Sequence, residues 1–170
     1  GMRSDAAIIP PRPGPVAPNL VDLEAARAGF DWAGAEAALD RLPDGGLNIA
    51  HEAVSRHARG SRATHVALRW LGKRGERVEL SYADLEAATA RFANALVALG
   101  VAPGERVFAL AKRIPELFVA ALGTLRARAV FCPLFSAFGP EPIASRLALG
   151  DAKVLVTTGG LYQRQVAELR

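Results

Sequence analysis

Three short apolar runs, each bordered by segments with helical periodicity, constrain the fold of this chain more than any other feature. The runs occupy residues 107–111, 130–134 and 154–157. Strands that are buried on both faces have continuous apolar sequences of this kind. Because such strands alternate with helices, we expect a parallel sheet whose strands are joined by right-handed crossover helices.

The segments between these runs carry signals for the ends of helices. Ser81 and Asp84 have the spacing of a capping box and begin a helix that Gly100 ends. Pro115 and Pro140 open two further helices, since proline fits the first helical turn. The side chains that we expect to face the core from these three helices are Leu85, Thr89, Phe92, Leu96, Leu99, Phe118, Leu122, Leu125, Ile143 and Leu147.

The fold class that these patterns predict is α/β. An N-terminal arm and helices are followed by a β-hairpin and then by a β-α-β-α-β-α unit with a parallel sheet. Three strands are few for such a sheet, and no strand follows the last expected helix, over about 161–169. We therefore expect this unit to be an incomplete part of a larger domain, which continues in residues that the sequence does not contain.

Proline, glycine and capping residues divide the chain into three expected regions. Residues 1–20 are rich in proline and predict an extended or disordered arm. Residues 21–64 predict a helical lead in which Asp31 and Asn48 are helix N-caps. Residues 65–170 contain the hairpin and the partial α/β domain. The hairpin strands are expected over 65–71 and 77–81, with a Gly-Lys-Arg-Gly turn between them.

Composition excludes several classes of protein. The net charge is +4, and residues 51–80 alone account for all of it. This basic segment lacks the interleaved aromatic residues of a single-strand binder and any helix-turn-helix or zinc spacing, so we expect no nucleic-acid partner. No apolar run approaches about 18 residues, so we expect no membrane span. The single cysteine, Cys132, precludes an internal disulfide and fits a reducing, cytoplasmic setting.

Ligands of parallel sheets bind beyond the carboxyl ends of the strands, so three loops are candidates for a site. The loop after the second strand is the most unusual, because Phe135 and Phe138 flank small residues and a helix begins directly afterwards. It is either a ligand loop or a packed crossover with Phe as core filler. Spacing singles out no nucleophile, general base or metal set, so we assign no catalytic and no metal-binding residue.

Several residue strings resemble the acetyl-CoA synthetase branch of the AMP-forming acyl-CoA synthetase family, whose members form acyl-adenylates. The strings with the highest specificity run from Arg113 to Leu117 and from Val130 to Glu141. The other strings that carry the resemblance are 47–54, 80–85, 92–96 and 99–107.

The resemblance implies a ligase that acts in two steps. A carboxylate first attacks ATP, with Mg²⁺, to give an acyl-adenylate and pyrophosphate, and the thiol of coenzyme A then displaces AMP. Acetate or another short acid is the implied substrate. By the same resemblance, the residues expected near coenzyme A are Ser136, Ala137, Phe138, Gly139 and Arg164.

Residues 1–170 do not contain the family's Gly-rich phosphate loop ending in lysine, which the resemblance places further downstream. We therefore expect the chain to be the N-terminal piece of such a ligase and to be inactive alone. The alternative is a separate non-catalytic module that binds a nucleotide or coenzyme A, or that mediates an interaction. In either case, an uncovered sheet or last helix predicts self-association.

Overall fold

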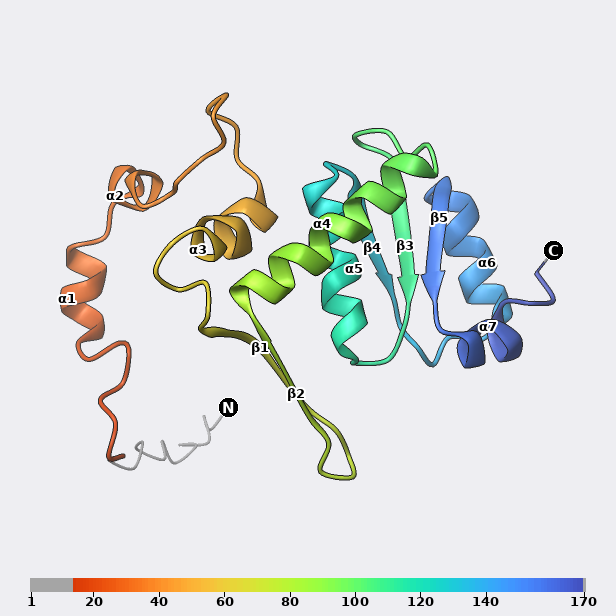
Figure 1. Cartoon of the computed structure of the whole chain (residues 1–170), viewed down its shortest axis with the longest axis horizontal. Helices are drawn as coiled ribbons and strands as arrows, with labels where there is room; N and C mark the ends of the chain where they lie inside the picture. Colours follow the sequence, from red (N-terminus) through yellow and green to blue (C-terminus); the bar gives the residue numbers. More distant parts are fainter. Residues whose placement is uncertain (1–13, 170) are drawn as a thin grey trace, which may run out of the picture. The chain divides into compact units, whose positions relative to one another are not determined.

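The computed structural model describes residues 14–169 (Figure 1). These residues fall into two compact units, one up to Leu39 and one from Asp40 onward. The expected N-terminal arm lies mostly outside the described residues. In the first unit, helix α1 (Leu23–Ala28) ends at Gly29 and helix α2 (Trp32–Ala37) follows. Asp31 caps α2 as predicted, because its side chain accepts a hydrogen bond from the backbone N–H of Gly34.

The second unit begins with a short irregular helix. A π-helical turn, η1 (His51–Ser55), continues directly into α3 (Arg56–Ala58). The Asn48 carboxamide oxygen accepts hydrogen bonds from the N–H groups of Ala50 and His51, so its predicted capping role is confirmed. The same side chain donates to the carbonyl of Leu125 at 2.8 Å and so ties this helix to a distant part of the chain.

The antiparallel hairpin consists of β1 (Val66–Leu71) and β2 (Arg77–Ser81). Gly75 has φ 87°, a conformation that favours glycine, and it allows the tight turn between the strands. The Trp70 indole N–H donates to the Arg113 carbonyl at 2.7 Å, which anchors the hairpin to the loop after β3 (Arg106–Leu110).

The predicted parallel unit is confirmed, with three strands in the order β4-β3-β5 (Figure 1). Strand β4 covers Val130–Leu134 and β5 covers Ala152–Thr157. The helices of this unit are α4 (Tyr82–Ala98), α5 (Pro115–Arg126), α6 (Pro140–Leu149) and α7 (Gly159–Gln165). The predicted capping box of α4 is present, since Ser81 and Asp84 exchange side-chain and backbone hydrogen bonds.

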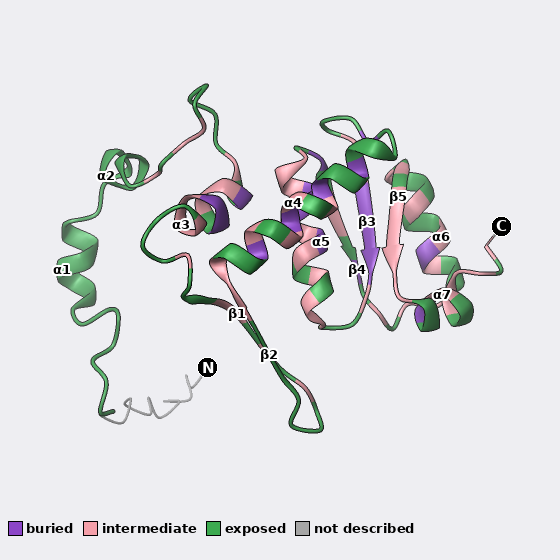
Figure 2. Cartoon of the chain, in the orientation of Figure 1, coloured by how far each residue is buried: buried purple, intermediate pink, exposed green. Residues whose placement is uncertain are grey.

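Strand β3 lies at the centre of two apolar clusters because its side chains alternate between the faces of the sheet. On one face, Val107 packs with Leu96 of α4 and with neighbouring residues. On the other face, Phe108 and Leu110 pack with Ile143 of α6 and with residues of β4 and α7. Figure 2 shows β3 as the most continuously buried strand.

The prediction of burial in the core is wrong for two residues. Leu99 is 64% exposed and Phe118 is 43% exposed. The reason is that α5 meets α4 through small residues, Ala120, Gly123 and Thr124, which are the buried positions of α5. Helices in contact through small side chains approach closely, so larger residues on either side point away from the contact.

Among residues 14–169, no helix is long and apolar enough to cross a membrane.

Candidate functional site

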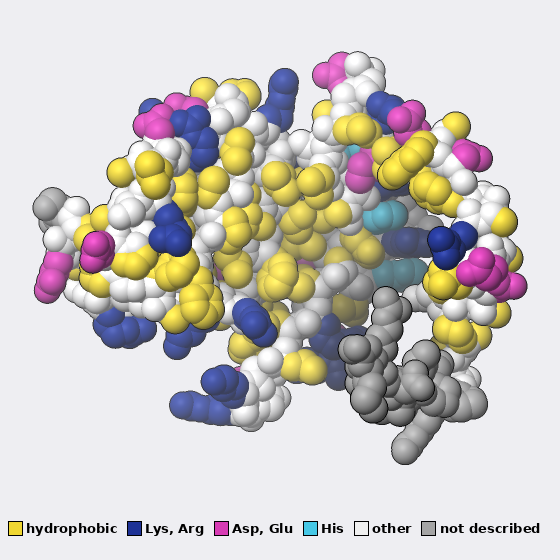
Figure 3. All heavy atoms as spheres, turned by 180° about the vertical axis from the view of Figure 1, so that it is seen from behind, with side chains coloured by type: hydrophobic (Ala, Val, Ile, Leu, Met, Phe, Trp, Pro, Cys, Tyr) yellow, Lys and Arg dark blue, Asp and Glu magenta, His cyan; other side chains and the backbone are white. Residues whose placement is uncertain are grey.

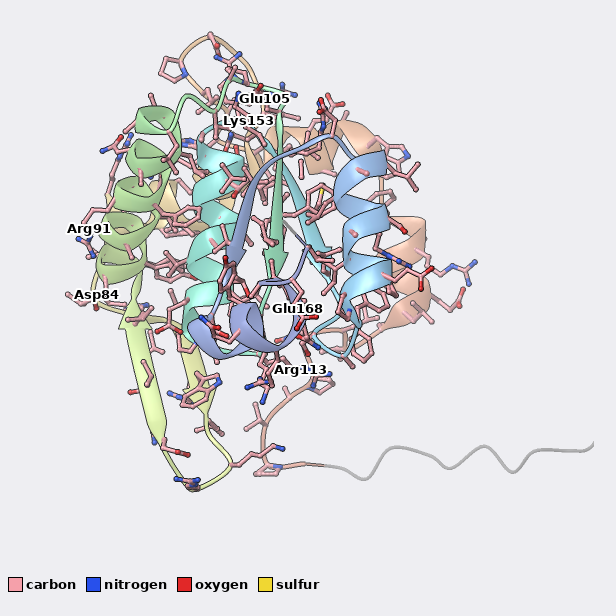
Figure 4. All side chains as sticks on the ribbon, turned by 90° about the vertical axis from the view of Figure 1, so that its right-hand side faces the viewer. Asp84, Arg91, Glu105, Arg113, Lys153 and Glu168 are labelled. Atoms are coloured by element: carbon pink, nitrogen blue, oxygen red, sulfur yellow. The ribbon has the colours of Figure 1, made fainter. Side chains whose placement is uncertain are left out.

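The carboxyl ends of the three parallel strands lie at one end of the sheet, where the candidate loops meet. Figure 4 shows Arg113 and Glu168 at this end and Glu105 and Lys153 at the opposite end, where the strands begin. Glu105 and Lys153 form an ion pair of 3.7 Å. The expected ligand loops lie at the first of these two ends.

The two aromatic rings of the loop after β4 differ in burial. The rings of Phe135 and Phe138 meet edge to face with centroids 5.7 Å apart. Phe138 is half-buried against the apolar cluster, and the Arg146 guanidinium lies 4.2 Å from its ring centroid. Phe135 is 65% exposed. Phe138 is thus core filler, whereas Phe135 is available to a ligand.

Helix α7 lies beside this loop. The Gln165 amide donates to the carbonyl of Ser136 at 3.1 Å, so the structure brings Ser136 and the helix of Arg164 together. The Arg164 side chain is exposed and folds back toward Gly160, where a Cβ atom added to the glycine would lie 3.2 Å from an Arg164 guanidinium nitrogen. No pattern in the sequence indicated the contact that Gln165 makes.

The other predicted residues of the loop lie within the same turn. Ala137 is exposed, and Gly139 is the N-cap residue of α6, with open space where a side chain would stand. Small side chains leave the backbone accessible to a ligand here. The Phe138 N–H donates to the Phe135 carbonyl at 3.0 Å, which keeps the turn compact.

A small apolar cavity of about 50 Å³ lies where β3 and β5 end and α5 begins. The Thr157 hydroxyl is buried there without a hydrogen-bond partner among the described residues. This volume is far below the roughly 300–1,000 Å³ of small-molecule pockets, so the cavity does not hold a nucleotide. Its lining residues are Ala109, Ala111, Ile114, Glu116, Leu117, Ala120, Val156, Thr157 and Thr158.

A second polar region surrounds the helix η1–α3. The Glu52 carboxylate accepts hydrogen bonds from the N–H groups of Asp40 and Arg41 and from the Arg56 side chain. The bond from Asp40, followed by those from Arg41 and Arg56, lowers the pKa of Glu52 to about 2. His51 Nε2 lies 2.7 Å from an Asp40 carboxylate oxygen, which also holds this segment against the helix.

Two cavities flank this helix. The larger, about 490 Å³, is lined by Asp40, Arg56, His57, Gly60, Ser61 and Arg62. Figure 3 shows histidine side chains beside Lys and Arg side chains on this part of the surface. His51 and His57 contact different groups, since the His57 ring packs against Tyr82 at 5.1 Å. No group of His, Cys, Asp and Glu side chains within residues 14–169 is arranged to hold a metal ion.

A half-buried polar cluster links this helix to α4 and α5. The Glu86 carboxylate accepts from the Ser55 hydroxyl at 2.7 Å and from the Arg126 guanidinium at 2.6 Å. Burial alone would raise the pKa of Glu86, but the hydrogen bonds from Arg126 and Ser55 and the charges of Arg126 and Arg59 outweigh it and lower that pKa. The cluster joins residues that are 31 to 71 positions apart in the chain.

These features define a partial α/β domain of the open parallel-sheet class, with its candidate ligand loops at the carboxyl edge. Residues 54–170 match the model of the AMP-binding enzyme family, which is more than half of the chain. The chain therefore belongs to the AMP-binding enzyme family, and the resemblance found in the sequence is confirmed.

Relatives agree with this assignment. The chain is 38% identical over 148 residues to an acetyl-coenzyme A synthetase of Bacillus subtilis. The aligned region covers 86% of this chain and 26% of that protein. It is 37% identical over 121 residues to an acetyl-coenzyme A synthetase of Streptomyces avermitilis, over 71% of this chain and 19% of the other. The crystal structure of an acyl-CoA synthetase of Brucella canis superposes with a TM-score of 0.77 at 36% identity, over 87% of this chain and 27% of that one. The chain thus spans about a fifth to a quarter of the length of these relatives.

Proposed function

We propose that this chain forms part of an acid–CoA ligase that makes an acyl-adenylate from ATP and a carboxylate and then an acyl-CoA. The observation that carries the proposal is the family match over residues 54–170, together with two relatives named acetyl-coenzyme A synthetase. Acetate or another short acid is the proposed substrate, with ATP, Mg²⁺ and coenzyme A as the other small molecules. The cytoplasm is the proposed location.

The residues at the carboxyl edge fit contact with coenzyme A. The exposed Arg164 guanidinium offers charged donors for a phosphate group. The turn that contains Ser136, Ala137, Phe138 and Gly139 presents small residues beside the exposed Phe135 ring, on which a flat group can stack. We therefore propose that this turn and Arg164 bind coenzyme A, while Phe138 keeps the turn in place through its packing on the core.

The residues for the first chemical step are not found in 1–170. A bound triphosphate needs a Gly-rich loop with a lysine or an equivalent set of donors, and the sequence has no such loop. We assign no catalytic residue to this chain. Purified residues 1–170 are expected to show no acid-dependent exchange of pyrophosphate into ATP, and clear exchange by this chain would contradict the proposal.

A chimera tests the proposed function directly. Residues 54–170 of this chain replace the matching segment of the Bacillus subtilis acetyl-coenzyme A synthetase, and acetate-dependent ATP–pyrophosphate exchange is measured. Exchange above that of an empty control supports a role in a ligase. A chimera that unfolds cooperatively but shows no exchange overturns it.

The second candidate function is a separate module that binds coenzyme A or a nucleotide without catalysis. Exposure of Phe135 and Arg164 in this chain favours it, because both groups are accessible without any further segment. Calorimetric titration of residues 1–170 with coenzyme A tests this binding. Arg164→Ala is expected to weaken it about tenfold or more, whereas Arg91→Ala, which removes an exposed arginine on α4, is expected to leave it unchanged.

A further inference from the structure

A second cavity beside the helix η1–α3 has a lining that the proposed ligase function does not use. It measures about 160 Å³ and lies at the end of the sheet where the strands begin. This position follows from Arg126, the last residue of α5, and from Arg128, whose carbonyl accepts a hydrogen bond from Gly104 just before β3. The cavity is thus remote from the carboxyl-edge loops. Its lining residues are Leu42, Asn48, His51, Ser55, Arg59, Arg126 and Arg128.

The lining has three guanidinium groups and no carboxylate. The Glu86 carboxylate lies 2.6 Å from Arg126 and 3.9 Å from Arg59, and the Asp40 carboxylate lies 2.7 Å from His51 of the lining. Arg128 forms no ion pair with any residue in the part of the chain that the structure describes. These two carboxylates cannot neutralise three arginines, so the cavity keeps a positive charge that suits an anion.

The backbone of Arg128 adds an independent observation. Its φ is 63°, in the left-handed region that glycine occupies without strain and that other residues seldom adopt. The Arg128 carbonyl is fixed in the turn before β3 by the Gly104 N–H at 2.9 Å. This conformation ends helix α5, because the N–H groups of Arg128 and Ala129 donate to the carbonyls of Leu125 and Thr124, so the backbone of Arg128 is held in one place beside the cavity.

The local helix geometry directs further donors toward the same space. The π-helical turn His51–Ser55 and the residues after it present His51, Ser55 and Arg59 to one cavity. The Ser55 hydroxyl bonds to Glu86 and accepts from Arg126 at 3.1 Å, which fixes the direction of the Arg126 fork. Arg126 is therefore pre-oriented, while the Arg59 and Arg128 side chains are exposed enough to close on a ligand.

We propose that this cavity binds a phosphate group, with Arg59 and Arg128 as its direct ligands and Arg126 held beside it by Glu86 and Ser55. The volume is about half of the smallest typical small-molecule pocket, so it suits one tetrahedral anion and excludes a whole nucleotide. The planar guanidinium forks match the oxygens of a phosphate, and a dianion fits the excess positive charge better than a carboxylate does.

Arg128→Gly separates binding from folding, because glycine removes the side chain and relieves the left-handed backbone. Isothermal titration and the melting temperature are measured with inorganic phosphate at constant ionic strength. For the unchanged chain, phosphate is expected to bind and to raise the melting temperature. Arg128→Gly and Arg59→Gln are each expected to weaken phosphate binding about tenfold or more while the chain stays folded.

Arg91→Ala is the matched control, because Arg91 is exposed on the outer side of α4, away from α5 (Figure 4). It is expected to bind phosphate like the unchanged chain. The proposal is overturned if phosphate has no more effect than chloride at the same ionic strength, or if Arg91→Ala weakens binding as much as Arg128→Gly does.

Parallel titrations with acetate, pyrophosphate and adenosine monophosphate identify the source of the group. Acetate is expected to bind more weakly than phosphate, and stronger binding of acetate overturns the choice of a phosphate group. Tighter binding of adenosine monophosphate that Arg128→Gly abolishes shows that the phosphate belongs to a larger molecule, whereas tighter binding of inorganic phosphate identifies the free ion. The site lies apart from Ser136 and Arg164, so failure here leaves the proposed ligase function unaffected.

Discussion

Gly123 decides how closely α4 and α5 approach each other. A Cβ atom at this position would lie 2.7 Å from Phe92 Cδ1 and 3.0 Å from the carbonyl oxygen of Thr89. The carbonyl belongs to the backbone of α4 and cannot move aside without shifting the helix. Helical propensity favours alanine over glycine, so the observed glycine indicates that packing outweighs propensity here.

Gly123→Ala is therefore expected to lower the free energy of unfolding by about 1–3 kcal/mol, the usual cost of overpacking. Gly159→Ala is the control, because the space around Gly159 is open and its backbone is not left-handed. Chemical denaturation of both variants measures the difference. Equal stability of Gly123→Ala and the unchanged chain would contradict the close approach of the two helices.

Glu52 gives the chain a specific response to acid. Its pKa is about 2 in the folded chain, against 4.5 for an unperturbed glutamate, so the folded state favours the ionised carboxylate. The stability that this group contributes is fully present above pH 4.5 and is lost as the pH falls toward about 2. The unchanged chain is thus expected to be more stable than Glu52→Gln at neutral pH, with the difference shrinking across that window. Urea denaturation from pH 7 to pH 2 measures it, and a difference that does not vary with pH would count against this account.

At the scale of helices and strands, local signals predicted most of the fold. The bounds of β4 and the start of α5 agree with the sequence prediction, because apolar runs and first-turn prolines are local features. Burial within a helix was harder to predict. Leu99 and Phe118 have the spacing of core residues, but which side of α5 meets α4 depends on small residues that carry no periodic signal.

The candidate sites, too, could be predicted from the sequence only in part. The strand order indicated a turn at Ser136 after β4, and the role of this turn in ligand binding stays a prediction. The division of the chain at residues 20 and 64 stays a prediction. The cavity between Arg59 and Arg128 was not predictable, because it combines side chains from segments that are close only after folding.

The capping box of α4 offers a test at this scale. The Ser81 hydroxyl accepts from the Asp84 N–H at 3.1 Å, and the Asp84 carboxylate accepts from the Ser81 N–H at 3.0 Å. Ser81→Ala is expected to lower the free energy of unfolding by about 1 kcal/mol, because one N–H at the helix start loses its partner. Ser145→Ala, in the exposed part of α6, is the control and is expected to change little. Thermal and urea denaturation compare them, and equal effects of the two substitutions would argue against the cap.

At the scale of the whole molecule, several large apolar side chains are exposed to water. Phe135 is 65% exposed, Leu149 is 89% exposed and Leu99 is 64% exposed. Figure 3 shows hydrophobic side chains over much of one face. Residues of this size that remain uncovered favour association in water.

Residues 1–170 are accordingly expected to self-associate as their concentration rises. Light scattering coupled to size-exclusion chromatography measures the mass against the 17.9 kDa of a single chain. Phe135→Ser, which removes an exposed ring at the carboxyl edge, is expected to reduce the association. A constant single-chain mass up to high concentration would contradict this expectation.

Pro133 in β4 makes the two edges of the three-stranded sheet differ in their ability to pair with a further strand. Proline has no backbone N–H, and within sheets it occurs on edge strands, which is where β4 lies. A further strand on the β4 side would meet an interrupted ladder of donors, whereas β5 contains no proline and presents a continuous one. A strand that extends this sheet, whether from the same polypeptide or from a second copy, is therefore expected to pair more favourably with β5 than with β4.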